Sequence, residues 1–450
     1  MKKIKFRKIL VAYIILMISI CIIYAVNVKL AITLSPLLPL FLLLTSVKNA
    51  LMIFDYRNFY LLGLLFWSSG KSLPLLGSLF DNDIDLNNNY YILSIILSPM
   101  LVLLFKRPLL IDNGLFKAKI MANNENNKKL LPSFLIFIFI FTLYYLVWIN
   151  VQNIQVFFIS TFILKALILL SISYCSLKIN LHKFPHILLA SVILMLSVFL
   201  YSLDSSNRTS YLLPLSVICT GIYMSNYKYI NSFLYYKKFI FIIFIILFFV
   251  IILLLADLNK KYPFSDIDSF FSIVMNYDFL LDVIVNSNYY QKEIYSFDYF
   301  YVLNELVKNN LSYPGALLFQ LASSVTPRIF FPSKEVTNLS LLLWENGITP
   351  GPLYYELFLE PLIDSGVFGV LLYFSLFLFI NSVVFNILIK SIKPFNINFS
   401  ISVYIINLII IFYVLRGPSI LIIWYLLLPN FILYGINFFS NSKNGYIHEL

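Results

Sequence analysis

The sequence predicts an all-α polytopic membrane protein with about twelve transmembrane helices and one large, partly helical extracytoplasmic loop. Three observations support this fold class. Apolar residues make up 60% of the 450 residues, only 12% are charged, and the mean hydropathy is +0.88, which is too apolar for a soluble domain. These apolar residues fall in runs near the roughly 20 residues that a spanning helix needs. One long polar segment, residues 257–365, interrupts the runs.

Each apolar run is expected to be an α-helix, because backbone groups in lipid must bond within their own segment. The strands of a membrane barrel would instead alternate over about 10 residues. The run after the basic start Met1–Lys8 is expected to be a retained first helix rather than a cleaved signal peptide. In chain order, the predicted spans are 9–26, 29–47, 58–79, 90–105, 131–149, 154–174, 185–203, 209–226, 238–256, 366–388, 397–415 and 418–438.

Lys and Arg in the short loops predict the orientation, because cytoplasmic loops are enriched in both. With a cytoplasmic N-terminus, the loops that fall inside all contain Lys or Arg; they are 48–57, 106–130, 175–184, 227–237 and 389–396. The outer loop 80–89 has three acidic residues and no basic one. We therefore expect a multi-pass membrane protein with both termini cytoplasmic. The net charge of +11 follows from this bias, and no nucleic-acid partner is needed to explain it.

Residues 257–365 form the extracytoplasmic loop in this arrangement. They separate helices 1–9 (residues 1–256) from helices 10–12 and a short cytoplasmic tail (residues 366–450). The loop contains 13 of the 21 acidic residues of the chain and only six basic ones. Structureless connections of this length are uncommon in proteins, so we expect a functional segment with some helix.

Arginine is scarce in the chain, and half of its arginines are predicted on the outer side. Arg208, Arg328 and Arg416 all fall there, against the usual trend. A guanidinium group is a planar fork that suits phosphate oxygens and stays charged. Three of them at one membrane face could hold a diphosphate. Each could instead be an isolated residue that extends its charge to the interface.

Two further charged residues are candidates for the same site. Lys71 lies inside the third predicted span, on its outer half, where a charge is a functional candidate unless it reaches the interface. Glu356 stands near the return of the chain to the membrane. It could accept a proton from a hydroxyl group, or it could be a solvated acid of an acidic loop. The cysteines and the acidic run 81–85 lack metal-ligand spacing, so we expect neither a metal nor a cofactor.

The most specific pattern of the chain extends from Thr326 to Gly369. It consists of Pro327-Arg328, Pro332-Ser333-Lys334, Gly347-Ile348-Thr349-Pro350-Gly351-Pro352, Glu356 and Gly366-Val367-Phe368-Gly369. Together with the predicted topology, this pattern resembles the bacterial O-antigen and capsular polysaccharide polymerases of the Wzy type. The chain departs from the family's described spacing of Arg followed eleven residues later by Gly. After Arg208, Arg328 and Arg416 those positions hold Cys219, Leu339 and Leu427.

The resemblance implies a GT-C-like fold and polymerisation of undecaprenyl-diphosphate-linked oligosaccharide repeat units at the outer face of the inner membrane. It implies that Arg328 and Arg416 hold the diphosphate leaving group, with help from Arg208 or Lys334, and that Lys71 is a further binding candidate. Glu356 is the expected base. The implied partners are the lipid-linked oligosaccharides and, in the same pathway, a chain-length regulator and a flippase.

Three other functions stay open from the sequence. An O-antigen ligase shares this architecture but relies on a histidine in the outer loop, whereas residues 257–365 contain none. A polysaccharide flippase or transporter would not need a loop of this length and would usually show internal repeats. A glycosyltransferase that uses a lipid-monophosphate sugar would usually have acidic residues in its first outer loop, and the segment around Asn27 has none.

Overall fold

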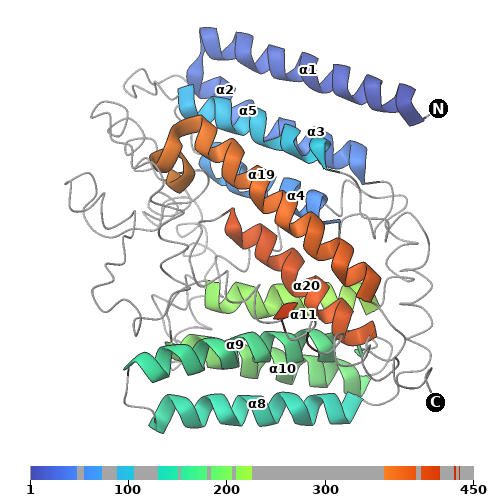
Figure 1. The fold of residues 1–450 in the computed structure, drawn as a ribbon, viewed down its shortest axis with the longest axis vertical. Helices are drawn as coiled ribbons and strands as arrows, with labels where there is room; N and C mark the ends of the chain where they lie inside the picture. The colour runs from blue at the N-terminus through green and yellow to red at the C-terminus, as the bar shows by residue number, and fades with distance from the viewer. Residues whose placement is uncertain are drawn as a thin grey trace, which may run out of the picture.

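The computed structural model describes residues 2–47, 55–72, 89–105, 130–150, 154–179, 184–204, 209–225, 359–391 and 397–415, with residues 430, 431 and 435. The regular structure within these residues is entirely helical (Figure 1). The helices are α1 (Lys2–Val26), α2 (Val28–Leu34), α3 (Leu37–Ser46), α4 (Tyr56–Ser72), α5 (Asn89–Leu104), α8 (Leu130–Asn150), α9 (Ile154–Ser176), α10 (Phe184–Asp204), α11 (Thr209–Ser225), α19 (Leu359–Ser391) and α20 (Ile397–Val414).

Every predicted span that falls on described residues coincides with helix, so the all-helical prediction is confirmed for this part of the chain. The main difference is at α19, which begins at Leu359 and so includes seven residues that the sequence assigned to the long loop. The predicted span 238–256, most of 418–438 and the loop up to residue 358 lie outside the described residues.

Within the described residues, four segments are long and apolar enough to cross a membrane. They are Ile9–Val26, Val28–Ser46, Leu131–Asn150 and Asp364–Val383. Several shorter apolar helices accompany them, among them Ile92–Leu104 and Phe399–Ile411. These lengths and this composition are those of a membrane-embedded helical protein.

Local polar groups explain how the first span turns into the second. Asn27 separates α1 from α2, and its Oδ1 accepts a hydrogen bond of 2.9 Å from the Leu30 amide, which caps α2. The second span is broken into α2 and α3 at Ser35 and Pro36, because proline has no amide to donate. The Ser35 hydroxyl donates to the carbonyl of Ile32 at 2.7 Å, so this carbonyl is satisfied at the break.

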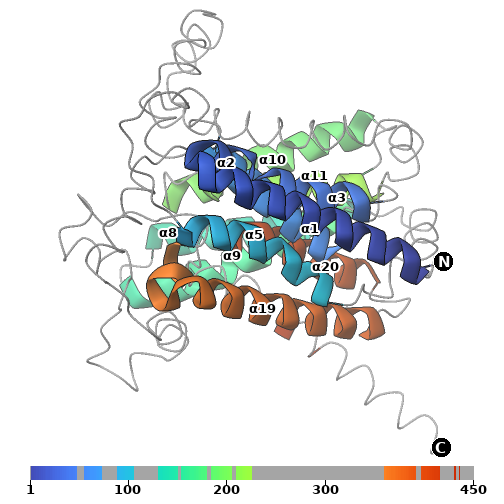
Figure 2. The same ribbon diagram turned by 90° about the horizontal axis from the view of Figure 1, so that it is seen from above.

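The helices lie alongside one another in a bundle, with α1 and α8 at opposite margins (Figure 1, Figure 2). Helix α4 packs against α3, α5 and α20, while α20 also packs against α9 and α11. Residues 400–411 of α20 are all buried, as are Asp55 and residues 56–68 of α4. By contrast, α1 exposes Val11, Ile15 and Ile22, a face suited to lipid.

Small and polar side chains join the inner helices. The Ser173 hydroxyl of α9 donates to the Ser402 carbonyl of α20 at 3.2 Å. Asn407 and Asn430 exchange two amide hydrogen bonds of 3.1 and 2.9 Å. Helices in lipid associate through such hydrogen bonds and through close approach at small residues, because burial of apolar surface gives them little advantage there.

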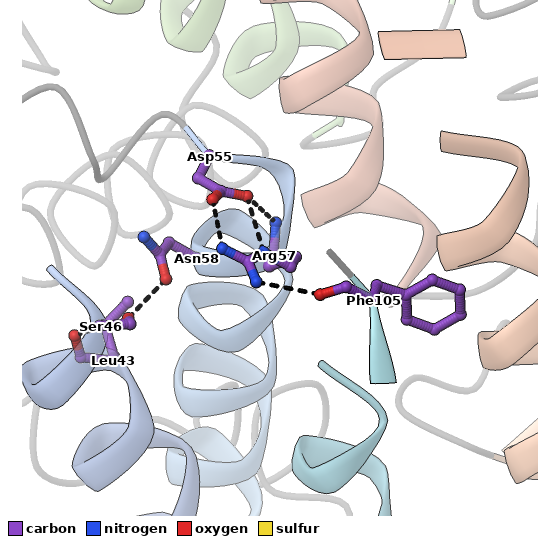
Figure 3. A network of polar contacts seen from close by, with 6 residues as sticks. All are labelled: Leu43, Ser46, Asp55, Arg57, Asn58 and Phe105. Carbon is purple, nitrogen blue, oxygen red and sulfur yellow. Dashed lines mark hydrogen bonds and ion pairs between the residues drawn. The ribbon is translucent and has the colours of Figure 1, made fainter. Parts of the chain in front are cut away.

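Interhelical contacts divide the helix termini between two ends of the bundle. At one end, which we name the Arg57 end, α4 begins beside the ends of α3 and α5 (Figure 3). Contacts of Tyr60 with Phe374 and of Tyr56 with Ser382 show that α19 runs antiparallel to α4. The bend of α19 at Asp364 therefore lies at the opposite end, which we name the Asp364 end.

The remaining helices follow the same alternation. The contact of Ser173 with Ser402 joins the last turns of α9 to the first turns of α20, so these two helices are antiparallel. Lys178, just after α9, donates to Ser133 near the start of α8 at 2.7 Å. The Ser225 hydroxyl at the end of α11 donates to the carbonyl of Ile179 at 3.1 Å. Figure 1 shows the consequence, since α8 ends and α9 begins on the side where the bend of α19 lies.

Candidate functional site

The sequence-predicted site residues fall mostly on parts of the chain that the structure does not describe. Lys71 lies in the last turn of α4. Arg208, Arg328, Lys334, Glu356 and Arg416 lie outside the described residues.

The helix termini that adjoin four of these residues in the sequence gather at the Asp364 end. Helix α4 ends there one residue after Lys71, and α11 begins there one residue after Arg208. Helix α20 ends there at Val414, two residues before Arg416, and α19 begins there three residues after Glu356. The Asp364 end is therefore the place in the described fold from which a shared site would be built.

The best-defined polar feature at this end is the bend inside α19. Ser365 and Gly366 leave helical geometry, and Gly366 has φ 62° and ψ −152°. An L-residue with a side chain rarely adopts this conformation, whereas glycine does so at little cost. The glycine that opens the Gly366–Gly369 motif is thus explained by the backbone turn that it makes.

Asp364 lies directly before this bend and is almost completely buried, with 1% of its surface exposed. Its Oδ2 accepts hydrogen bonds of 2.8 Å from the hydroxyl of Ser365 and 2.8 Å from that of Tyr373. A buried carboxylate is costly unless it is hydrogen-bonded, and these two donors satisfy that need. The pair Asp364–Tyr373 ties the first part of α19 to the part beyond the bend.

The second glycine of the motif permits close packing across the bend. A Cβ added to Gly369 would collide with the carbonyl oxygen of Pro361 and would lie 3.0 Å from Cβ of Ser365. The segment before the bend therefore rests directly on the first turn of the helix after it. Pro361 and Gly369 meet there, a contact that no sequence pattern predicts.

Sequence reasoning missed Asp364 and also missed Lys29, a second buried charged residue at this end. Lys29 lies in the first turn of α2, is 7% exposed, and forms a polar contact. Helix α2 packs against α4, whose last turn contains Lys71. Their positions in the sequence could have indicated both residues, because Lys29 and Asp364 stand at the edge of an apolar run. An ionisable residue there is a functional candidate.

A second polar network fixes the Arg57 end (Figure 3). Asp55 precedes α4, and its Oδ1 accepts a hydrogen bond of 3.0 Å from the Arg57 amide. The guanidinium of Arg57 meets both carboxylate oxygens, with Nη2–Oδ2 of 2.7 Å and Nε–Oδ1 of 3.2 Å. Its Nη1 donates to the carbonyl of Phe105 at 3.1 Å, just after α5. This pair is buried, with side-chain exposures of 10% for Arg57 and 5% for Asp55.

The same network reaches α3. The Ser46 hydroxyl lies 2.6 Å from Oδ1 of Asn58 and 3.0 Å from the carbonyl of Leu43 (Figure 3). The Ser46–Asn58 contact and the Arg57–Phe105 bond together tie α3, α4 and α5 at one level. Because Arg57 is paired and enclosed, its main contribution in the fold is structural, in addition to the orientation signal that the sequence suggested.

Among the described residues, no group of three or more His, Cys, Asp or Glu side chains is placed to hold a metal ion. Comparison with known proteins adds no further assignment: no family model, no curated protein and no solved structure matches the chain.

Proposed function

We propose that the protein polymerises lipid-diphosphate-linked oligosaccharide repeat units, with the site at the Asp364 end of the bundle. The observation that carries the proposal is the gathering of helix termini there. The termini next to Arg208, Arg416, Glu356 and Lys71 in the sequence belong to four different helices, α11, α20, α19 and α4. Such a site would face the outer leaflet, in the orientation that the Lys and Arg distribution favours.

The proposed reaction is a glycosyl transfer. The hydroxyl oxygen of the acceptor sugar bonds to the anomeric carbon of the growing chain, and the bond from that carbon to the lipid diphosphate breaks. Glu356 takes the hydroxyl proton as general base. The leaving diphosphate gains negative charge, which Arg328 and Arg416 stabilise with Arg208 or Lys334 and with Lys71.

The fold suits lipid-linked substrates for a physical reason. A polyprenyl chain needs an apolar surface continuous with the bilayer, while its diphosphate and sugars need a polar site at the interface. A helical bundle with apolar outer faces and charged residues at the edges of its apolar runs provides both. Inner-membrane location, the GT-C-like fold, and the chain-length regulator and flippase as partners belong to the same proposal.

Deletion of the gene tests the proposal in the cell. We expect surface polysaccharide with a single repeat unit on a gel, in place of a ladder of lengths. Free polymer without attachment would indicate a ligase, and loss of all surface repeat units would indicate a flippase. Either of these results would contradict the polymerase.

The assignment of the charged residues has its own test. Alanine variants at Arg208, Arg328 and Arg416 should each shorten or abolish the ladder when expressed in the deletion strain. The matched control is Arg107→Ala, since Arg107 is predicted on the cytoplasmic side. Full-length polysaccharide from all three outer variants would overturn the assignment.

A further inference from the structure

Three hydroxyl groups inside the bundle have no hydrogen-bond partner among the described residues. They belong to Tyr60 of α4 and to Ser94 and Ser98 of α5, and each of these residues has 0% of its surface exposed. A buried hydroxyl without a partner destabilises a protein. Buried polar groups that no side chain or backbone group reaches are therefore usually bonded to ordered water.

The three hydroxyls lie in one region between α4 and α5. Ser94 and Ser98 are four residues apart and share one face of α5. The hydroxyl of Tyr60 lies near that of Ser98, although the two do not have the geometry of a hydrogen bond. The Tyr60 ring packs edge-on against Phe374 of α19, with 5.8 Å between ring centroids. Because α5 lies between α1 and α19 (Figure 1, Figure 2), helices enclose this region.

A proline in α5 adds a fourth polar group to the region. Pro99 stands inside α5, directly after Ser98, and has no amide hydrogen to donate. The carbonyl of Ile95, four residues earlier, therefore lacks its usual helical donor. The next carbonyl, that of Ile96, accepts a hydrogen bond of 2.9 Å from the hydroxyl of Tyr13 in α1, so the backbone of α5 bonds to groups outside its own helix here. In membrane helices, ordered water is one of the groups that satisfy a carbonyl freed by proline.

We propose that ordered water occupies this region, bound by the hydroxyls of Tyr60, Ser94 and Ser98 and by the carbonyl of Ile95, and that it joins α4 to α5. A water molecule can donate and accept hydrogen bonds, and inside proteins it makes about three of them, which suits three hydroxyls and one carbonyl. This set contains no carboxylate to compensate a cation, and its complete burial excludes a lipid headgroup or a sugar. Such a water site would be present whether or not the protein transfers sugar.

The direct test is a structure of the purified full-length protein in a lipid mesophase, at a resolution that shows ordered water. We expect a water peak within about 3 Å of the hydroxyl oxygens of Tyr60 and Ser98, which is the length of an ordinary hydrogen bond. A direct bond between these two hydroxyls with no water peak beside them would overturn the proposal. A dry contact between α4 and α5 would overturn it equally.

Unfolding in mixed detergent micelles gives a second test. Tyr60→Phe and Ser98→Ala each remove one hydroxyl and change the side-chain volume little. With water bound, each variant should raise the unfolding equilibrium constant roughly fivefold to tenfold, because one hydrogen bond to the water is lost. A dry site predicts the opposite sign, since deletion of an unpartnered hydroxyl removes its desolvation penalty. An unchanged or lower unfolding constant for both variants would contradict bound water.

A double-mutant cycle tests whether one water network links the two helices. The combined effect of Tyr60→Phe and Ser94→Ala should be at least about threefold smaller than the product of the single effects, since both hydroxyls bond to the same water. The matched control cycle pairs Tyr60→Phe with Ser171→Ala in α9, whose hydroxyl donates to the Ile168 carbonyl of its own helix at 2.8 Å. Those two effects should multiply within about twofold. Effects of Tyr60→Phe and Ser94→Ala that also simply multiply would refute the shared water.

Discussion

At the scale of single residues, the polar groups that matter most are those paired inside the bundle. Arg57 and Asp55 form a two-pronged ion pair that is enclosed between α4 and α5. Removing one member of a buried pair leaves the other charge without compensation, which costs far more than losing an exposed pair. Stability at this end therefore depends on whether each buried charge keeps its partner, and less on how many charges are present.

Replacing Arg57 by Met should destabilise the protein by about 3–5 kcal/mol, because Asp55 stays buried without its partner. Unfolding in mixed detergent micelles measures the change in free energy. The control is the double variant Asp55→Asn/Arg57→Met, which removes both charges and should recover a large part of the loss. A double variant as unstable as Arg57→Met would show that the ion pair is not the source of the effect.

Gly366 gives a prediction about backbone conformation. Gly366→Ala should cost about 1–3 kcal/mol, since alanine is strained at φ 62° and ψ −152°. Gly435→Ala is the matched control, because a Cβ at that glycine would meet no atom within 4 Å and should change stability by no more than about 0.5 kcal/mol. Equal unfolding free energies for the two variants would contradict the positive-φ conformation of Gly366 in the bend.

At the scale of elements, the sequence predicts the helices well and their interruptions poorly. The span 397–415 coincides with α20 and 154–174 with α9, because the length of an apolar run is itself the physical requirement for crossing lipid. The bend at Ser365 and the break at Ser35 were not predicted. Each depends on a side chain that bonds a backbone carbonyl or a carboxylate at the interruption of the helix. The tertiary fold determines which side chain does so.

Close approach of α9 and α11 provides a test at this scale. A Cβ added to Gly221 would collide with the hydroxyl of Ser176 and lie 2.7 Å from its Cβ. Gly221→Ala should therefore cost about 1–3 kcal/mol through overpacking. Adding Ser176→Gly should restore most of the unfolding free energy, and failure to do so would place the strain elsewhere.

At the scale of the whole molecule, the alternation of helices assigns the helix termini to two ends. The sequence predicted this division from the order of the apolar spans, with Lys and Arg indicating which side is cytoplasmic. The contacts at Arg57, Ser133 and Ile179 group the predicted inner termini together. The placement of Arg208, Arg328, Lys334, Glu356 and Arg416 stays a prediction, because these residues lie outside the described part of the chain. Loops between helices carry no periodicity from which their positions could be derived.

Orientation in the membrane can be checked directly. With the native cysteines replaced by alanine, Asn207→Cys, next to α11, should react with an impermeant maleimide added to intact cells. Lys128→Cys, close before α8, should react only after the membrane is opened. The reverse pattern would place the Asp364 end in the cytoplasm and would remove the basis for an outward polymerisation site.

The most direct test of the central claim is a reaction with purified protein in vesicles, supplied only with an undecaprenyl-diphosphate-linked repeat unit. Mass spectrometry of the products should show lipid-linked chains that grow by whole repeat units, with release of lipid diphosphate. The triple variant with alanine at Arg208, Arg328 and Arg416 should give no such series. Repeat units recovered unchanged after incubation with correctly folded parent protein would contradict the polymerase.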